Sequence, residues 1–314
     1  MSLIALEEHL FTNDINQRLG GRLFPGFADR LDDVGEQRLA AMDAAGIDLQ
    51  VLSFPSHEIQ EAETRLSIEL AHDANDQLAA VVAQRPDRFQ AFAALPLSDV
   101  DASIRELRRS ILDLGFVGPM LFGQTHGHFL DEPQFEPLWA EIEALDVPVY
   151  LHPAEPPTAV RDAYYSNIDA SIARALERGA WGWHAELGMH VLRLAASGTL
   201  ERHRSVQLIV GHMGENLPFS LQRASDQLGN PGGLPRNVMQ TVLDQVAITM
   251  AGYPYEPALL CALLVFGADN ILFSVDYPFA SNVRAADALA QAPLSPLDRE
   301  KIASGNARRI LNLR

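Results

Sequence analysis

Short apolar runs alternate along the chain with segments in which apolar residues recur every three or four positions. The runs are rich in β-branched and aromatic residues, which favour strands, whereas the periodic segments between them are typical of helices. Eight runs are candidate strands, at residues 3–6, 48–54, 89–95, 116–122, 147–151, 206–210, 245–249 and 270–275. Helical sequence follows each run, and several of these helical segments end in glycine, where a helix commonly stops.

This alternation of strands and helices predicts the fold. Strands that are apolar along most of their length and are separated by helices form parallel sheets covered on both faces. Eight such units in 314 residues fit a distorted (β/α)8 barrel, or TIM barrel, built as a single domain over residues 1–314. A doubly wound open sheet is the alternative, but no glycine-rich phosphate loop follows the first run.

Composition narrows the classes of partner and the cellular location. The chain has 24 Lys and Arg against 41 Asp and Glu, a formal net charge of −17, which argues against binding nucleic acid or anionic membranes. The single cysteine, Cys261, excludes an internal disulfide, and its apolar surroundings predict a buried thiol. The chain has neither a signal-peptide pattern nor an apolar run long enough to span a bilayer, so we expect a cytoplasmic protein.

Potential metal ligands follow several of the predicted strands. In a barrel of this kind, functional side chains gather at the carboxyl ends of the strands. The first run ends in Glu7, Glu8 and His9, the fifth in His152, and the eighth in Asp276. Alternate residues of an extended strand face the same side, so Glu7 and His9 are expected to face together. Glu8 then points the other way and is expected to be structural.

Two carboxylates and two imidazoles form a ligand set suited to Zn²⁺, Mn²⁺ or Fe²⁺. Because two carboxylates neutralise a divalent ion, the ion acidifies bound water less than it would in a histidine-rich site. This charge count favours an anchor for an anionic, chelating substrate. Two simpler interpretations stay open: Glu7 and Glu8 could be a solvated strand end, and Asp276 could cap the turn before Pro278.

A second group of polar residues follows the sixth strand, in the sequence GHMGE at 211–215. We expect Glu215 to lie in the first turn of the next helix and to pair with His212, which would fix one imidazole tautomer for proton transfer. Arg223, eight residues further on, would share the same helical face and could contact a substrate carboxylate or phenolate. Alternatively, Glu215 is only a favourable acid at a helix start, and Arg223 an exposed helix residue.

Other histidines are expected to serve different purposes. His126 and His128 form an H-x-H pattern, but they fall in a glycine-flanked loop, where we expect a loop role, covering the active site. His190 lies within a helical pattern and is expected to pack.

Five segments in this order carry a resemblance to a known family: ALEEHL, LHP, WGWHAELGMHVLRLAASG, LIVGHMGENLPFSLQR and SVDYPF. With these segments the chain resembles the amidohydrolase-related decarboxylases, and within them the γ-resorcylate (2,6-dihydroxybenzoate) and 2,3-dihydroxybenzoate decarboxylases. The resemblance extends over nearly the whole chain, from residue 4 to residue 311. An E-x-H opening, in place of the superfamily's more common H-x-H, is typical of the dihydroxybenzoate decarboxylase branch.

The resemblance implies a metal-dependent, non-oxidative decarboxylase of an ortho-hydroxylated aromatic acid. The implied roles are metal binding by Glu7, His9, His152 and Asp276, proton handling by His212 and Glu215, and substrate binding by Arg223 and Phe279. The metal would be one divalent ion, Mn²⁺ or Zn²⁺, and Asp276 would protonate the ring carbon that bears the carboxylate. No organic cofactor is implied, because the ortho hydroxyl stabilises the dearomatised intermediate.

Members of the family associate, so a homodimer or homotetramer with a small aromatic acid as its substrate is expected. Two positions depart from the family pattern: His184, where a small or apolar residue is usual, and Tyr277, where Trp is common. Both could alter the substrate pocket. The rival function is a metal-dependent hydrolase of a lactone, amide or similar bond, and a non-catalytic metal-stabilised protein is a third possibility.

Overall fold

The computed structural model describes residues 2–21, 24, 26–55 and 57–313. The strands are β1 (Ile4–His9), β2 (Leu49–Ser53), β3 (Phe89–Ala91), β4 (Met120–Phe122), β5 (Val149–His152), β6 (Leu208–Val210), β7 (Val246–Thr249) and β8 (Ile271–Leu272). Each of them overlaps one of the eight predicted runs, which confirms the expected alternation.

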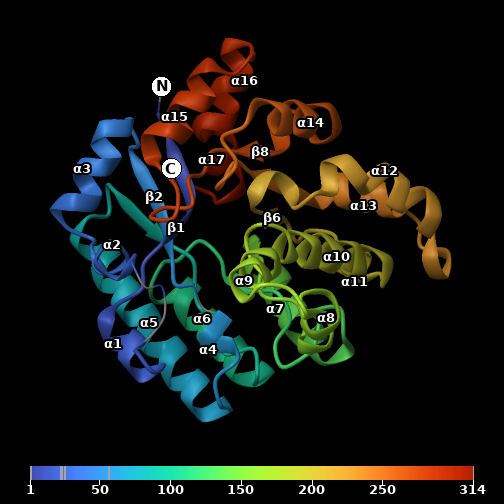
Figure 1. Ribbon diagram of the computed structural model, residues 1–314, viewed down its shortest axis with the longest axis horizontal. Coiled ribbons are helices and arrows are strands. Elements are labelled where there is room, and N and C mark those ends of the chain that lie inside the picture. The colour runs from blue at the N-terminus through green and yellow to red at the C-terminus, as the bar shows by residue number, and fades with distance from the viewer. Residues whose placement is uncertain (1, 22–23, 25, 56, 314) are drawn as a thin grey trace.

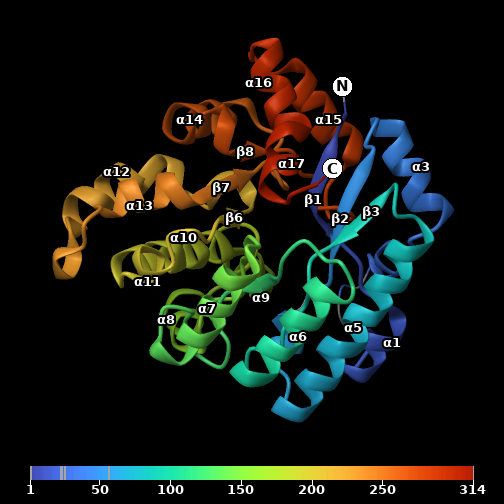
Figure 2. The same cartoon turned by 180° about the vertical axis from the view of Figure 1, so that it is seen from behind.

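Helices connect the strands and form the outer layer (Figures 1 and 2). The α-helices are α1 (Asn13–Arg18), α2 (Ala28–Asp32), α3 (Glu36–Ala45), α4 (His57–Gln60), α5 (Thr64–Gln84), α6 (Val100–Leu112), α7 (Glu136–Leu145), α8 (Thr158–Tyr164), α9 (Ala170–Glu177), α10 (Gly182–Ala196), α11 (Thr199–Arg202), α12 (Leu217–Leu228), α13 (Val238–Gln245), α14 (Glu256–Phe266), α15 (Asn282–Gln291), α16 (Pro296–Glu300) and α17 (Asn306–Ile310). Single helical turns occur at Pro133–Phe135, His212–Gly214, Pro231–Gly233 and Ala268–Asn270, and a π-helical turn at Lys301–Gly305.

The strands form a barrel with two irregular seams. One parallel sheet has the order β1-β2-β3 and the other has the order β4-β5-β6-β7-β8. Single bridges join the two sheets, between Ala93 and Pro119 at one seam and between Leu6 and Ser274 at the other. Because the strands follow one another in sequence order, the order never reverses as it does in a doubly wound sheet. The structure therefore confirms the distorted (β/α)8 barrel.

Buried side chains pack together in the interior of the barrel. Alternate residues of β1 divide between two layers: Ile4 and Leu6 point inward, whereas Leu3 and Ala5 pack against the helices. The inner layer is completed by Val51, Phe92, Met120, Phe122, Tyr150, Ile209, Ala247 and Leu272. Every strand, or the residue directly after it, thus contributes to a packed floor beneath the carboxyl ends, as in other barrels of this type.

Glu8 connects β1 to the segment that follows β8 by hydrogen bonds. Its carboxylate is fully buried and accepts hydrogen bonds from the backbone N–H groups of Val275 (2.9 Å) and Tyr277 (3.2 Å). Arg38, also fully buried, donates to the His9 carbonyl at 2.5 Å. Burial raises the pKa of Glu8 to about 8, against the opposing effects of the two N–H donors and the Arg38 charge. Glu8 is therefore structural, as expected, but it lies inside the fold.

Two further observations concern solvent and membrane exposure. No helix in the described part of the chain is long and apolar enough to cross a membrane. Cys261, on α14, is partly exposed, so the expectation of a buried thiol is wrong. Helix α14 is apolar on nearly all sides: it buries Leu259, Ala262 and Phe266, whereas Leu264 is exposed.

Replacing Arg38 by Met tests this seam. The substitution keeps most of the side-chain volume but removes the donor to the His9 carbonyl and the charge beside Glu8, so we expect unfolding to require ~3 kcal/mol less free energy. Arg65→Met is the matched control, because the Arg65 side chain is 86% exposed and, among the described residues, forms its ion pair with Glu69 one helical turn away. That control should change stability by under ~0.5 kcal/mol. Urea unfolding measures both, and equal effects would contradict the assignment.

Candidate active site

Five potential catalytic or metal-binding side chains meet at one end of the barrel. Glu7 and His9 come from β1, and His152 is the last residue of β5. His212 begins the turn directly after β6, and Asp276 follows β8. Parallel strands bring their carboxyl ends to the same edge of a sheet, which explains why residues so distant in sequence lie together.

The backbone of β1 is irregular where the first ligand lies. Glu7 has φ +64°, and the register with β2 shifts between Ala5 and Glu8, so β1 carries one extra residue as a bulge. The sequence argument assumed a regular extended strand, on which Glu7 and His9 would face the same side. That assumption is wrong at Glu7. Bulges redirect side chains next to active sites, and here the bulge turns the Glu7 carboxylate toward the barrel axis.

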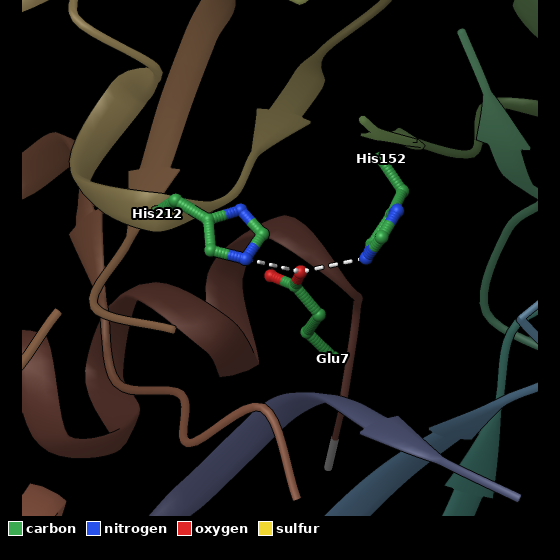
Figure 3. Close-up of side chains that lie close together, drawn as sticks. All are labelled: Glu7, His152 and His212. Carbon is green, nitrogen blue, oxygen red and sulfur yellow. Dashed lines mark ion pairs between the residues drawn. The ribbon is translucent and has the colours of Figure 1, made fainter. Parts of the chain in front are cut away.

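The carboxylate of Glu7 lies between two imidazoles (Figure 3). Its Oε1 is 3.1 Å from Nε2 of His152 and 3.5 Å from Nε2 of His212. Its Oε2 accepts a hydrogen bond from the Tyr150 hydroxyl, which also contacts Thr249 at 3.1 Å. Glu7 is fully buried, and Oε1 has no hydrogen-bond partner among the described residues. A buried carboxylate oxygen without a partner is costly unless a cation binds it.

A second potential ligand group shares Glu7. Single ligand atoms of Glu7, His9 and Asp276 lie within 4.8 Å of one another, and those of Glu7, His152 and His212 do the same. His9 Nε2 is 3.4 Å from Asp276 Oδ1. The two groups together contain all four predicted metal ligands, with His212 beside them.

The rings of the two predicted histidine ligands are oriented by their second nitrogens. His152 Nδ1 donates to the Pro153 carbonyl at 2.7 Å, so its Nε2 lone pair faces Glu7. His9 Nδ1 contacts the Ser53 hydroxyl at 3.2 Å. Metal-binding histidines are usually held in this way, with one nitrogen bonded to the protein and the other free for the metal. The arrangement fits one divalent ion among Glu7, His9, His152 and Asp276.

His212 and Glu215 form the expected pair, although the local structure differs from the expectation. His212 Nδ1 is 2.6 Å from Glu215 Oε1. Glu215 is not in a helix: it lies in a left-handed conformation (φ +53°), and α12 begins only at Leu217. The spacing argument that placed Arg223 on the same helical face as Glu215 therefore fails.

Arg223 lies away from these side chains. It is exposed on α12 and is absent from the described residues that line the cavity above the site. A substrate contact by Arg223 stays a prediction.

His184 was not predicted as part of the site, but the structure places it there. Its Nδ1 is 2.5 Å from Glu215 Oε2, and its Nε2 is 2.9 Å from the Gly179 carbonyl oxygen. Glu215 thus lies between two imidazoles, those of His212 and His184. The sequence offered one signal, since His184 stands where the family pattern has a small or apolar residue.

Buried charges shift the pKa values of this group. Burial alone would lower the pKa of His212, but the charges of Glu7 and Glu215 raise it well above its usual value. Burial opposes ionisation of Asp276, yet hydrogen bonds from His212 and His9 lower its pKa to about 2. His212 therefore holds a proton beside an ionised Asp276, with 3.8 Å between Nε2 and Oδ2.

A cavity of about 510 Å³ opens above these side chains. His9, His152, His212 and Asp276 line its floor. Aromatic side chains form much of its wall, namely Phe24, Phe27, Phe122, Trp183 and Phe279. The Phe279 ring lies 5.7 Å from that of His9 and 4.9 Å from that of Phe27. An apolar slot above a polar floor suits a flat aromatic ligand with a polar group at one end.

The H-x-H loop lies outside this floor. His126 faces Glu61 at 3.5 Å, and His128 is 2.7 Å from Glu132. His126 lines a neighbouring cavity that shares His57 and Glu58 with the first cavity. The structure thus places this pair in a loop, as expected, and apart from the potential metal ligands; that the loop covers the active site stays a prediction.

Comparison with known proteins finds related proteins that align with nearly the whole chain. Residues 28–313 match the amidohydrolase family. The chain is 39% identical to the γ-resorcylate decarboxylase of Rhizobium sp., over 99% of this chain and 98% of that protein. A 2,6-dihydroxybenzoate decarboxylase solved in complex with 2,6-dihydroxybenzoate is 37% identical, with a TM-score of 0.90 over 100% of both chains. A dihydroxybenzoic acid decarboxylase of Polaromonas sp. JS666, solved with manganese and the inhibitor 2-nitroresorcinol, is 34% identical over 99% of this chain and 97% of that one, with a TM-score of 0.90.

Gly211→Ala tests whether the position of the Glu7 carboxylate decides metal binding. A Cβ at Gly211 would lie 2.5 Å from Glu7 Oε2, so the carboxylate would have to move, while φ is −70° and imposes no strain on Ala. We expect divalent-metal affinity to fall about 10- to 100-fold with the fold intact. Gly305→Ala is the control, since its nearest atom would be 3.6 Å away. Titration of metal-free protein by calorimetry measures both, and unchanged affinity in the Gly211 variant would contradict the geometry.

Proposed function

Because the chain belongs to the amidohydrolase family, we propose that it is a metal-dependent, non-oxidative decarboxylase of an ortho-hydroxylated aromatic acid such as a dihydroxybenzoate. The observation that carries this proposal is the carboxylate–imidazole cluster around Glu7 at the floor of an aromatic-walled cavity. Relatives that share 34–39% of their residues with this chain are decarboxylases of such acids. Their names support the substrate class, and the cavity walls are consistent with it.

We propose that one divalent ion, Mn²⁺ or Zn²⁺, is held by Glu7, His9, His152 and Asp276. Glu7 Oε1, which has no hydrogen-bond partner among the described residues, and His152 Nε2, which lies 3.1 Å from it, support this assignment. When bound, the ion supplies positive charge that offsets the two carboxylates and orients the carboxylate and ortho oxygen of the substrate. The chemistry suggests no organic cofactor, because the ortho hydroxyl donates electron density to the ring when the ring is protonated and so stabilises the dearomatised intermediate.

The cavity walls would orient the aromatic ring. Phe279 and Phe27 pack 4.9 Å apart, and Trp183 and Phe122 lie on the same cavity surface. Contact with these apolar faces would keep water away from the reacting carbon and place the carboxylate of the acid toward the floor.

Decarboxylation consumes one proton in each turnover, since an aromatic carboxylate and a proton give the arene and carbon dioxide. The ring carbon gains a C–H bond, the bond to the carboxyl carbon breaks, and its electron pair stays with the ring. Asp276 Oδ2 is the proposed donor to the ring carbon. His212 Nε2, 3.8 Å from that oxygen and held protonated by its acidic neighbours, would return a proton to it.

The enzyme is further proposed to act as a homodimer or homotetramer. Two large apolar side chains, Phe219 on α12 and Leu264 on α14, are 90% and 88% exposed and would be covered by association. A cytoplasmic location stays a prediction.

The first test compares the two candidate reactions. Carbon dioxide release from 2,6- and 2,3-dihydroxybenzoate supports decarboxylation, whereas turnover of a lactone or amide panel alone would support the rival hydrolase.

Asp276→Asn should then lower the turnover rate at least about 100-fold with the fold retained, because the proton donor is lost. His212→Ala should lower turnover while keeping the metal, whereas His152→Ala should lower metal content. A near-normal rate in the Asp276 variant would refute its role.

The pH dependence of substrate binding gives a second test. Glu58 lines the cavity, and burial raises its pKa to about 7, so its carboxyl is neutral at lower pH and charged above pH 7. A charged Glu58 repels an anionic substrate, so we expect KM to rise about tenfold from pH 6 to pH 8.5, which corresponds to ~1.4 kcal/mol of repulsion. Glu58→Gln should abolish this rise. Glu61→Gln, which alters only the neighbouring cavity, should keep it. A KM that stays flat in the unmodified enzyme would contradict the prediction.

A further inference from the structure

His184 is a buried imidazole that the proposed reaction leaves without a role. It lies on α10, is 4% exposed, and its ring centre is 5.0 Å from that of His212. Glu215 separates the two rings, with Oε1 2.6 Å from His212 Nδ1 and Oε2 2.5 Å from His184 Nδ1. One carboxylate therefore bonds to two imidazoles through its two oxygens.

Both ring nitrogens of His184 are engaged, and this fixes the ring. The Gly179 carbonyl can only accept a hydrogen bond, so Nε2 of His184 carries a hydrogen. Nδ1 lies 2.5 Å from Glu215 Oε2, which is a short hydrogen-bond distance. The ring can turn only by breaking two hydrogen bonds, and Glu215 can turn only by breaking its bonds to both imidazoles. His184 thereby fixes the rotation of the Glu215 carboxylate.

The turn that carries Glu215 needs such support. His212, Met213, Glu215 and Asn216 all have positive φ values, between 46° and 65°. Non-glycine residues in this conformation cost about 1–3 kcal/mol each and persist only where the surroundings hold them. Helix α10 contacts the turn at a second point, since a Cβ at Gly188 would lie 2.5 Å from the Glu215 carbonyl oxygen. Helix α10 thus holds both the backbone and the side chain of Glu215.

We propose that His184 is a positioning residue of the reaction: through Glu215 it keeps the hydrogen of His212 on Nδ1 and aims Nε2 of His212 at Glu7 and Asp276. This role rests on the proposed function, because it concerns the residue that returns the proton to Asp276. His184 is absent from the described residues that line the cavity, although its neighbours Gly179 and Trp183 are among them. Its loss should therefore affect the turnover rate more than substrate binding.

The experiment compares three variants of the metal-loaded enzyme with a dihydroxybenzoate that the unmodified protein decarboxylates. His184→Leu keeps the volume but cannot bond to Glu215, and we expect kcat to fall about 10- to 100-fold with KM within about twofold. His184→Asn places an amide N–H near the position of Nδ1, so it should recover most of the lost rate. His190→Leu is the matched control on the same helix: His190 is buried and accepts from the Leu130 N–H, outside the site. It should lower stability without lowering kcat.

A second measurement does not depend on activity. Nitrogen-15 NMR of histidine-labelled protein, with His212→Ala to assign the signals, reports on the hydrogen bond between His212 Nδ1 and Glu215. We expect a hydrogen-bonded Nδ1–H in the unmodified protein and in His184→Asn, and a shifted, weaker hydrogen bond at Nδ1 in His184→Leu. Unchanged His212 signals together with an unchanged kcat in His184→Leu would overturn the proposal. If no hydroxybenzoate is decarboxylated, the proposed function fails, and the NMR spectra alone support or overturn the positioning of His212 by His184.

Discussion

The buried carboxylate of Glu7 is the constraint on which the rest of the site depends. A fully desolvated charge costs several kcal/mol unless hydrogen bonds and opposite charges compensate it. The Tyr150 hydroxyl donates a hydrogen bond to Oε2 of Glu7. The other oxygen, Oε1, faces His152 and His212 and has no hydrogen-bond partner among the described residues. Gly211 leaves just enough room for the carboxylate. Glu7 therefore presents a buried carboxylate oxygen without a hydrogen-bond partner among the described residues at the barrel mouth, which is the arrangement that a divalent cation stabilises.

The sequence predicts this convergence because it follows from topology. Once eight strands alternate with helices, the residues that follow each strand must meet at one end of the barrel. His152 and Asp276 are 124 positions apart in sequence, yet both contact residues of the first strand, His152 through Glu7 and Asp276 through His9. This prediction needs no sequence motif that contains both residues. The strand count alone determines which ends are neighbours.

What the sequence could not predict depends on local backbone geometry. A bulge at Glu7 and the left-handed turn at Glu215 are not visible as periodicity, because a positive φ at a non-glycine residue is imposed by tertiary contacts. The turn also breaks the helical register on which the placement of Arg223 relied. His184 escaped prediction for a related reason: its partner Glu215 lies 31 positions later on a different element, and their contact depends on how α10 packs beside the turn.

The strongly acidic chain and its proposed anionic substrate are compatible because charge acts locally in the site. At physiological ionic strength, surface charges are largely screened beyond about 8 Å, so the net charge of −17 governs long-range encounter more than binding within the cavity. Inside, a divalent ion would balance Glu7 and Asp276, and burial keeps Glu58 neutral up to about pH 7. The substrate carboxylate would then meet a floor with no excess negative charge. Binding of the proposed anionic substrate would thus depend on the buried carboxyls and on Arg174 and Arg178, which also line the cavity, more than on the net charge of the surface.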